Sequence, residues 1–321
     1  MHIVRRPGRP RRIPAALALI AALVIGLSLA GCGRSEKILI GFSQATMNHP
    51  FRVAMVEDNK TYAQQHYKDV ELVATDGEDK ASKQVADVEA LIARRPEVLM
   101  LSPATADALT PITKRAMDAG IKVVTLDRQI NTPVTAHIGG DNRKIGAMAA
   151  QFIAGKLGGK GNIVEIQGTA GSSATVERAQ GFQEELKKYP EIRIVATTNA
   201  DYKRDKAITF MEDTIQRLPA GQINAVFAQN DEMALGAQNA LAQANRVQGV
   251  TVVGTDGENE GIRAVADGRL AATFTYPWCA PEGIQTAYKI AKGETVPDHT
   301  TLPSFQVDSS NVQQFLGKGF G

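Results

Sequence analysis

The sequence predicts two α/β lobes, each with a doubly wound parallel sheet. Short unbroken runs of apolar residues, rich in Val and Ile, alternate with longer amphipathic stretches. Such runs are typical of parallel strands that helices cover on both faces, because strands with one exposed face alternate apolar and polar residues. The same order of segments then occurs a second time, which indicates one duplication of a unit of roughly 120 residues.

The first unit alternates strands and helices from Ile38 onward. Its expected segments are a strand at 38–42, a helix at 51–66, a strand at 70–74, a helix at 83–93, a strand at 98–101, a helix at 108–119 and a strand at 123–126. Gly120 follows the third helix directly and is a typical C-terminal cap, because glycine adopts a positive φ without steric cost.

The second unit repeats this order after Gly139-Gly140-Asp141. Its expected segments are a strand at 162–166, a helix at 176–189 and strands at 194–197, 225–228 and 250–254. Two more strands, at 271–275 and 302–307, lie outside both units, so we expect three segments to cross between the lobes as a hinge. The expected N-terminal lobe comprises 37–140 and 276–302, and the C-terminal lobe comprises 141–275 and 303–321.

The first 31 residues have the pattern of a bacterial lipoprotein signal peptide. Five arginines precede an apolar run that ends in Leu29-Ala30-Gly31-Cys32, and no acidic residue lies among them. This ending resembles a lipobox, which implies lipidation of Cys32 and a short tether at 32–36. A plain membrane anchor is the alternative, because the run approaches the roughly 18 to 20 apolar residues that span a bilayer. Either way the sequence predicts a protein of the periplasm or cell envelope, held at a membrane.

Charge and composition argue against several classes of protein. Removal of residues 1–31 leaves 31 Lys and Arg against 34 Asp and Glu, a formal charge of −3, so nucleic-acid binding is not expected. The four histidines after residue 31 are scattered without ligand spacing, and the glycine-rich stretch 168–173 lacks the Lys-Ser/Thr ending of a phosphate loop, so no metal or cofactor is expected. We also expect no catalysis, since nearby arginines would keep Asp127 and Asp256 ionised and glycoside hydrolysis needs one acid protonated.

Polar side chains follow the predicted strands, at the edge where α/β sheets bind ligands. Asp127-Arg128, Asn230-Asp231 and Asp256 come directly after strands, and we expect Asp231 to cap the next helix while Asn230 faces the ligand. The negative and positive charges of these side chains roughly cancel, which suits a neutral polyol as the ligand. Aromatic faces for the C–H side of a sugar are available from four side chains, Phe51, Tyr202, Tyr276 and Trp278.

From Lys37 to about Val307 the chain resembles the ribose-type branch of periplasmic monosaccharide-binding proteins, which feed sugar ABC transporters. The resemblance rests on segments in both units, namely Pro50-Phe51, Thr125-Leu126-Asp127-Arg128-Gln129, Glu165-Ile166-Gln167-Gly168-Thr169, Glu177-Arg178, Phe227-Ala228-Gln229-Asn230-Asp231-Glu232-Met233-Ala234 and Asp256-Gly257. It implies the type I fold of that group. It also implies that the sugar hydroxyls are held by Asp127, Arg128, Arg178, Asn230 and Asp256, with aromatic rings from Phe51 and Tyr202.

Two departures from that branch bear on specificity. Ribose binders tend to carry Asn-Pro-Phe-Phe in the first loop, whereas this chain has His49-Pro50-Phe51-Arg52, with an aromatic–arginine pair like that of galactofuranose binders. Ribose binders also have a glutamine at the place of Tyr276. Arg52 and Tyr276 therefore join the expected site and favour a pentose, ketohexose or furanose other than ribose.

The function expected from the sequence is that of a monomeric, lipid-anchored receptor. It would close two lobes over one monosaccharide and deliver it to the permease of an ABC transporter. A sugar sensor that presents its ligand to a chemoreceptor or sensor kinase is the alternative. A repressor of the lactose-repressor class shares the two-lobe core, but would need a DNA-binding helix-turn-helix where this chain has an export signal.

Overall fold

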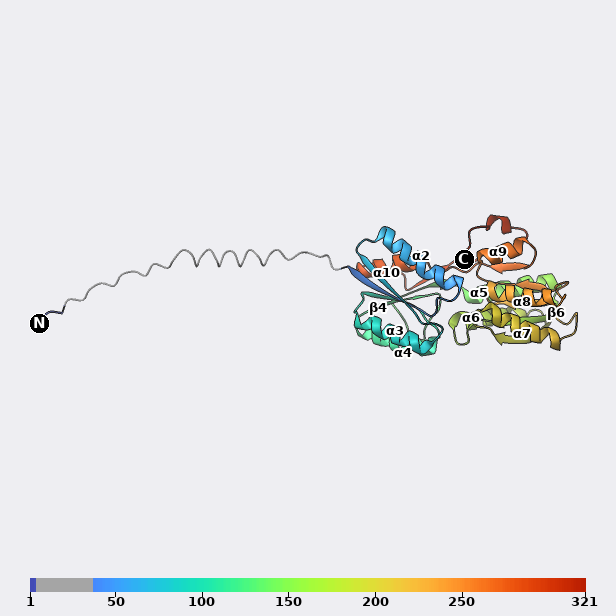
Figure 1. Ribbon diagram of the computed structural model, residues 1–321, viewed down its shortest axis with the longest axis horizontal. Helices are drawn as coiled ribbons and strands as arrows, with labels where there is room; N and C mark the ends of the chain where they lie inside the picture. The colour runs from blue at the N-terminus through green and yellow to red at the C-terminus, as the bar shows by residue number, and fades with distance from the viewer. Residues whose placement is uncertain (4–36) are drawn as a thin grey trace. The chain divides into compact units, whose positions relative to one another are not determined.

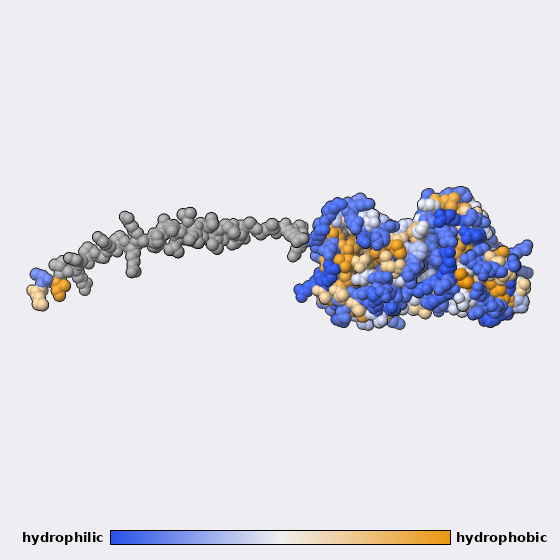
Figure 2. All heavy atoms as spheres, in the orientation of Figure 1, coloured by the Kyte–Doolittle hydropathy of each residue, from blue (hydrophilic) through white to orange (hydrophobic). Residues whose placement is uncertain are grey.

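The computed structural model describes residues 1–3 and 37–321, and residues 38–321 form one compact unit. Residues 4–31 of the predicted signal peptide and the whole tether at 32–36, including Cys32, lie outside the described residues. Among the helices that are described, none has the length and apolar character needed to cross a membrane. Hydrophilic side chains cover most of the face of residues 38–321 shown in Figure 2, with apolar ones scattered among them.

The N-terminal lobe contains a six-stranded, fully parallel sheet with helices on both faces (Figure 1). Its strand order is β2-β1-β3-β4-β5-β11. The strands are β1 (Ile38–Gln44), β2 (Val70–Asp76), β3 (Val98–Ser102), β4 (Lys122–Leu126), β5 (Ala136–Gly140) and β11 (His299–Leu302). One face is covered by α2 (Pro50–His66) and α10 (Glu282–Ala291), and the other by α3 (Ala81–Ala93) and α4 (Ala106–Asp118).

The C-terminal lobe repeats this architecture. Its strand order is β7-β6-β8-β9-β10-β12, with only β12 antiparallel to its neighbour. The strands are β6 (Lys160–Gln167), β7 (Glu191–Asn199), β8 (Ala225–Ala228), β9 (Thr251–Val253), β10 (Ala272–Phe274) and β12 (Gln306–Asp308). The helices are α5 (Asn142–Leu157) and α6 (Ser173–Leu186) on one face, and α7 (Arg204–Arg217), α8 (Asp231–Gln243) and α9 (Asn259–Ala266) on the other, followed by a 3-10 turn at Val312–Gln314.

The unbroken apolar strands are explained by two-sided burial. In β3, Val98 and Met100 pack beneath α2 and α10, whereas Leu99 and Leu101 pack beneath α3 and α4. Successive strand residues point to opposite faces, so a sheet with helices on both sides needs an apolar residue at every position. The predicted fold class is confirmed.

Both sheets place the first strand of their unit between the second and the third. The chain therefore winds outward in both directions from β1 in one lobe and from β6 in the other. In such sheets the ligand lies beyond the carboxyl ends of the strands, where the direction of winding reverses. The duplication thus gives each lobe an equivalent ligand edge.

Three segments connect the lobes, and one of them corrects an expectation. They leave β5 at Gly140, β10 at Phe274 and β11 at Leu302. The continuous strand predicted at 302–307 is wrong: it is split into β11 and β12, which belong to different sheets. Pro303 has no N–H to donate to a ladder, so the first strand ends there and residues 303–305 make the crossing. Phe305 and Thr275 then join two of the crossings through hydrogen bonds of 2.8 and 2.9 Å.

Candidate functional site

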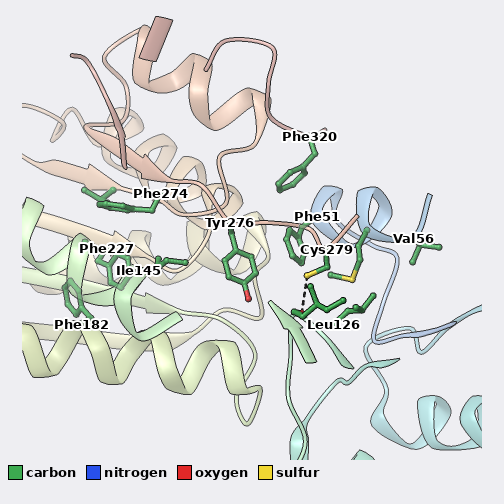
Figure 3. Close-up of a cluster of buried hydrophobic side chains, with 14 of the residues drawn as sticks. Phe51, Val56, Leu126, Ile145, Phe182, Phe227, Phe274, Tyr276, Cys279 and Phe320 are labelled. Atoms are coloured by element: carbon green, nitrogen blue, oxygen red, sulfur yellow. Dashed lines mark hydrogen bonds between the residues drawn. The ribbon is translucent and has the colours of Figure 1, made fainter. Parts of the chain in front are cut away.

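A small cavity lies where the two ligand edges meet. Side chains of both lobes surround about 250 Å³ of space there, part of which is open to solvent. Seven of the nine predicted site residues line it, together with His49 and Ala174: Phe51, Arg52, Asp127, Arg178, Tyr202, Asp256 and Tyr276. Figure 3 shows Phe51 and Tyr276 side by side, from different parts of the chain.

Two aspartates occupy equivalent places in the two lobes. Asp127 follows β4 and Asp256 follows β9, and both have positive φ, 62° and 111° respectively. A positive φ is uncommon for residues other than glycine and costs of order 1–3 kcal/mol, and such strain clusters at binding and catalytic sites. The fold therefore holds an aspartate with positive φ after an equivalent strand of each lobe, and both residues line the cavity.

The Asp127 carboxylate has an ion-pair partner and a hydrogen-bond partner in the protein. Arg52 Nη1 lies 2.7 Å from Asp127 Oδ2, and the Tyr276 hydroxyl donates to Oδ1 at 2.7 Å. Burial opposes ionisation, but the charges of Arg52 and Arg128 and the Tyr276 hydrogen bond together hold the pKa of Asp127 below its ordinary value. Asp127 is therefore a fixed negative charge.

The Asp256 carboxylate has no such partner. Within residues 37–321, no donor makes a hydrogen bond to it and no Lys or Arg nitrogen lies within 4.0 Å, although the residue is only 7 % exposed. Burial raises the pKa of Asp256 well above its ordinary value, and the opposing charge of Arg178 offsets this only in part. The arginines therefore do not hold the pKa of Asp256 below its ordinary value as they hold that of Asp127, because desolvation outweighs the charge of Arg178. A buried polar group without a partner is costly, so this carboxyl is a vacant hydrogen-bonding group on the cavity wall.

Asp256 belongs to a group of three buried acids in the C-terminal lobe. Asp231 accepts hydrogen bonds from Thr273 Oγ1 at 2.6 Å and from the Glu258 N–H at 2.9 Å, which fixes the loop that carries Asp256. Burial raises the pKa of Asp231 to about 7, against its hydrogen bonds. The pKa of Glu258 is raised by burial and by the neighbouring acids.

Arg178 is positioned by a residue that sequence reasoning left outside the site. Its Nε and Nη2 donate to Asn142 Oδ1 at 3.2 and 2.8 Å, and Nη1 donates to the Gln229 carbonyl. Asn142 Nδ2 also contacts the Tyr276 hydroxyl at 3.1 Å. Asp141 is the N-cap of α5, whereas Asn142 follows it in the first turn and is buried. The partners of Asn142 lie 36 and 134 residues away, so no local pattern indicates its role.

Aromatic rings form part of the wall. The Phe51 and Tyr276 centroids are 5.4 Å apart, and the Arg178 guanidinium lies 4.8 Å from the Tyr276 centroid. The Tyr202 hydroxyl bonds Thr175 Oγ1 at 2.8 Å, and its ring lies so close to Gly168 that a Cβ there would clash with it. The glycine-rich stretch thus makes room for an aromatic side chain. Trp278 does not line the cavity; its Nε1 donates to Asp58.

Two predicted residues lie beside the cavity and do not line it. Arg128 donates to the Pro103 and Ala104 carbonyls, and burial lowers its pKa to about 10. The N-cap of α8 is Asn230, and the expectation that Asp231 caps this helix is wrong. Asn230 has an extended backbone, and its Oδ1 accepts a hydrogen bond from the Met233 N–H at 2.9 Å. Its Nδ2 donates to the Tyr202 carbonyl, so it positions a wall residue.

His49 is the wall residue that sequence reasoning missed. Burial and the charges of Arg52 and Arg128 lower the pKa of its imidazole to about 3, so the ring is neutral. Its Nδ1 is buried without a partner among the described residues. The one sequence signal at His49 is that ribose binders tend to carry asparagine at this place.

The lobes touch each other around the cavity. The Gln129 N–H donates to Ser173 Oγ at 2.8 Å, and Lys203 Nζ pairs with Asp79 Oδ2 at 2.7 Å across the rim. Cys279 is buried, and burial raises the pKa of its thiol, which disfavours the reactive thiolate. No group of side chains in residues 37–321 has the arrangement of a metal site. The geometry suits enclosure of a small polyhydroxylated molecule between charged acceptors, guanidinium donors and aromatic faces.

Comparison with known proteins agrees with this geometry. Residues 40–295 match the model of the family described as "Periplasmic binding protein domain". A ribose import binding protein of Escherichia coli (strain K12) is 36% identical over 283 residues, which cover 87% of this chain and 94% of that protein. A xylitol-binding protein of Mycolicibacterium smegmatis is 34% identical over 92% of this chain and 86% of its own length. Among solved structures, the fructose-binding periplasmic domain of a hybrid two-component system superposes with a TM-score of 0.84, at 33% identity over 88% of this chain and 94% of that one.

Proposed function

Because this chain belongs to the periplasmic binding protein family, we propose that it is the substrate-binding protein of an ABC sugar importer. It binds one neutral monosaccharide, or a polyol of that size, between its two lobes. The observation that carries the proposal is Asp256, a buried carboxyl on the cavity wall that lacks any partner in the protein. Sugar hydroxyls donate and accept hydrogen bonds and carry no charge, so they can satisfy Asp256 without upsetting the balance of Asp and Arg around it.

Binding would couple to closure of the lobes. The N-terminal lobe contributes Phe51, Arg52 and Asp127 and the C-terminal lobe contributes Arg178, Tyr202 and Asp256, so neither half alone forms the site. A ligand that contacts both halves stabilises the closed form by its difference in affinity for the two states. An analogue that lacks one hydroxyl leaves a buried group unpaired, at a cost of about 1–3 kcal/mol.

Thermal melts across a panel of ligands test the proposal. We expect D-ribose, D-fructose, xylitol or a furanose sugar to raise Tm, since a ligand at a hundredfold excess over Kd adds about 2.7 kcal/mol to stability. Deoxy analogues of the best ligand should shift Tm less. The same samples, analysed for products after incubation, test for turnover, and none is expected. A panel without any shift, or a shift produced by a nucleotide instead, would contradict the proposal.

A sensory role is the second candidate, favoured by the similarity to the fructose-binding domain of a two-component system. The lobes and cavity would be the same, and only the recipient of the closed form would differ. Uptake of the bound sugar by cells that lack this protein separates the two. Lost uptake supports the importer, whereas normal uptake with a lost transcriptional or chemotactic response supports the sensor.

We further propose that the protein works in the periplasm as a lipoprotein, tethered through Cys32. The support is the Leu29-Ala30-Gly31-Cys32 sequence after an apolar run. One acyl chain binds membranes only marginally, so stable tethering takes more than one chain. Palmitate should label the wild type and not Cys32→Ser. Labelling that survives this substitution would contradict lipidation there.

A further inference from the structure

The segment Gly317–Gly321, here called the tail, lies across the boundary between the two lobes. Its backbone is held by the C-terminal lobe: the Asn259 N–H donates to the Phe320 carbonyl at 2.9 Å, and Asn259 Nδ2 donates to the Gly319 and Gly321 carbonyls at 3.1 and 2.9 Å. Gly319 passes so near the Gly257 carbonyl that a Cβ would meet it at 2.3 Å. The tail is therefore fastened to the loop that follows Asp256.

The side chain of Phe320 points the other way, into the N-terminal lobe (Figure 3). Its ring lies 5.6 Å from that of Phe51, edge to face, and 5.3 Å from that of Trp278, and it is only 6 % exposed. A Cβ on Gly321 would stand 3.2 Å from that of Pro50. Phe51 in turn packs on Tyr276 and lines the cavity. One continuous row of rings thus joins the tail to the ligand wall.

We propose that the tail is a fourth link between the lobes, and that Phe320 is a positioning residue that favours the closed form and holds Phe51 against the ligand. Opening separates the Asp256 loop from Pro50 and Phe51, so Phe320 must leave one of its two sets of contacts. Contacts present only in the closed form raise its population, and the apparent affinity rises with the population that binds. The inference rests on the proposed binding function for its first test only.

The first test compares Phe320→Ala with Val312→Ala. Val312 is equally buried but packs only within the C-terminal lobe, so it controls for lost stability. With D-ribose, xylitol and D-fructose as probes, Phe320→Ala should weaken binding about tenfold, mainly through faster dissociation. Phe320→Leu, which keeps apolar contact with Phe51 and Trp278, should recover most of the affinity. Asn259→Ala should imitate Phe320→Ala because it frees the tail. Equal affinities for Phe320→Ala and Val312→Ala would overturn the proposal.

The second test needs no ligand. Cysteines placed at Pro50→Cys and Gly321→Cys are near enough for a disulfide, whose Cβ atoms lie about 3.5–4.5 Å apart. Small-angle scattering of the ligand-free proteins should give a larger radius of gyration for Phe320→Ala than for the wild type, with the oxidised double variant as the closed reference. Equal radii for Phe320→Ala and the wild type would overturn the link even if the panel finds a ligand, and a larger radius for Phe320→Ala would support it even if the panel finds none.

Discussion

Replacing Asp256 with alanine is expected to remove ligand binding without destabilising the protein. The carboxyl has no hydrogen-bond partner in residues 37–321, so a bound sugar would supply its hydrogen bonds, and each sugar hydroxyl left without this partner costs about 1–3 kcal/mol. Losing two such bonds weakens binding by about thirtyfold or more. Isothermal titration with the best ligand of the panel gives the affinity, and urea unfolding gives the stability.

The pH dependence of stability shows whether Asp256→Ala loses binding specifically or because the protein is destabilised. A carboxyl whose pKa is raised on folding stabilises the protein below its ordinary pKa of 3.8, and this contribution is lost as pH rises. Asp256→Ala and Asp256→Asn should therefore gain stability relative to wild type from about pH 4 toward pH 7. Asp267→Ala, which removes an exposed aspartate of the same lobe, is the matched control and should change neither property. Full retention of the ligand-induced Tm shift in Asp256→Ala would remove Asp256 from the site.

Replacing Arg52 with alanine is expected to cause the largest loss of stability. Arg52 and Asp127 form an ion pair at 2.7 Å with side chains 3 % and 2 % exposed. Removing one partner of a buried pair leaves an uncompensated charge and costs about 3–5 kcal/mol. Arg52 also donates to Ser102 Oγ and Gln44 Oε1 at the ends of β3 and β1, so the loss falls on the N-terminal lobe. Urea unfolding at pH 7 measures it.

The stability lost in Arg52→Ala should be partly recovered at low pH and by a second substitution at Asp127. The main charge that lowers the pKa of Asp127 is that of Arg52, and without it burial dominates and the pKa rises. The deficit should then narrow as pH falls toward 4, because Asp127 becomes protonated and no longer carries a buried charge. Arg52→Ala combined with Asp127→Asn should be more stable than Arg52→Ala alone at pH 7. A double variant no more stable than the single one would show that Arg52 acts through packing.

The sequence predicted the fold because both lobes obey local rules. Unbroken apolar strands follow from helices on both sheet faces, and the duplication is visible as two matching orders of segments. Residues 302–307 were predicted as one strand although the lobe boundary was expected between 302 and 303, and Pro303 is the residue at which β11 ends. β5 escaped prediction because Ala136-His137-Ile138-Gly139-Gly140 has one β-branched residue and ends in two glycines, unlike the other buried strands.

The site was predictable where residues follow strands, and less so elsewhere. Asp127 and Asp256 lie at matching strand ends, which sequence position alone reveals. The raised pKa of Asp256 depends on how deeply the closed lobes bury the side chain, and the depth of burial cannot be predicted from the spacing of residues in the sequence. Asn142 and Phe320 act through contacts with residues far along the chain. The capping role of Asn230 depends on its extended backbone, which Asn and Asp adopt equally well, so the sequence could not choose between it and Asp231.

The two hydrogen bonds between Thr275 and Phe305 make a short ribbon of two neighbouring strand connections. A ribbon bends across its flat face far more easily than it shears along its length. The lobes would therefore open and close by rotation about a single hinge axis. Rotation about a single axis brings the two lobes to the same relative orientation each time they close. The closed protein would then present one defined surface to a membrane partner.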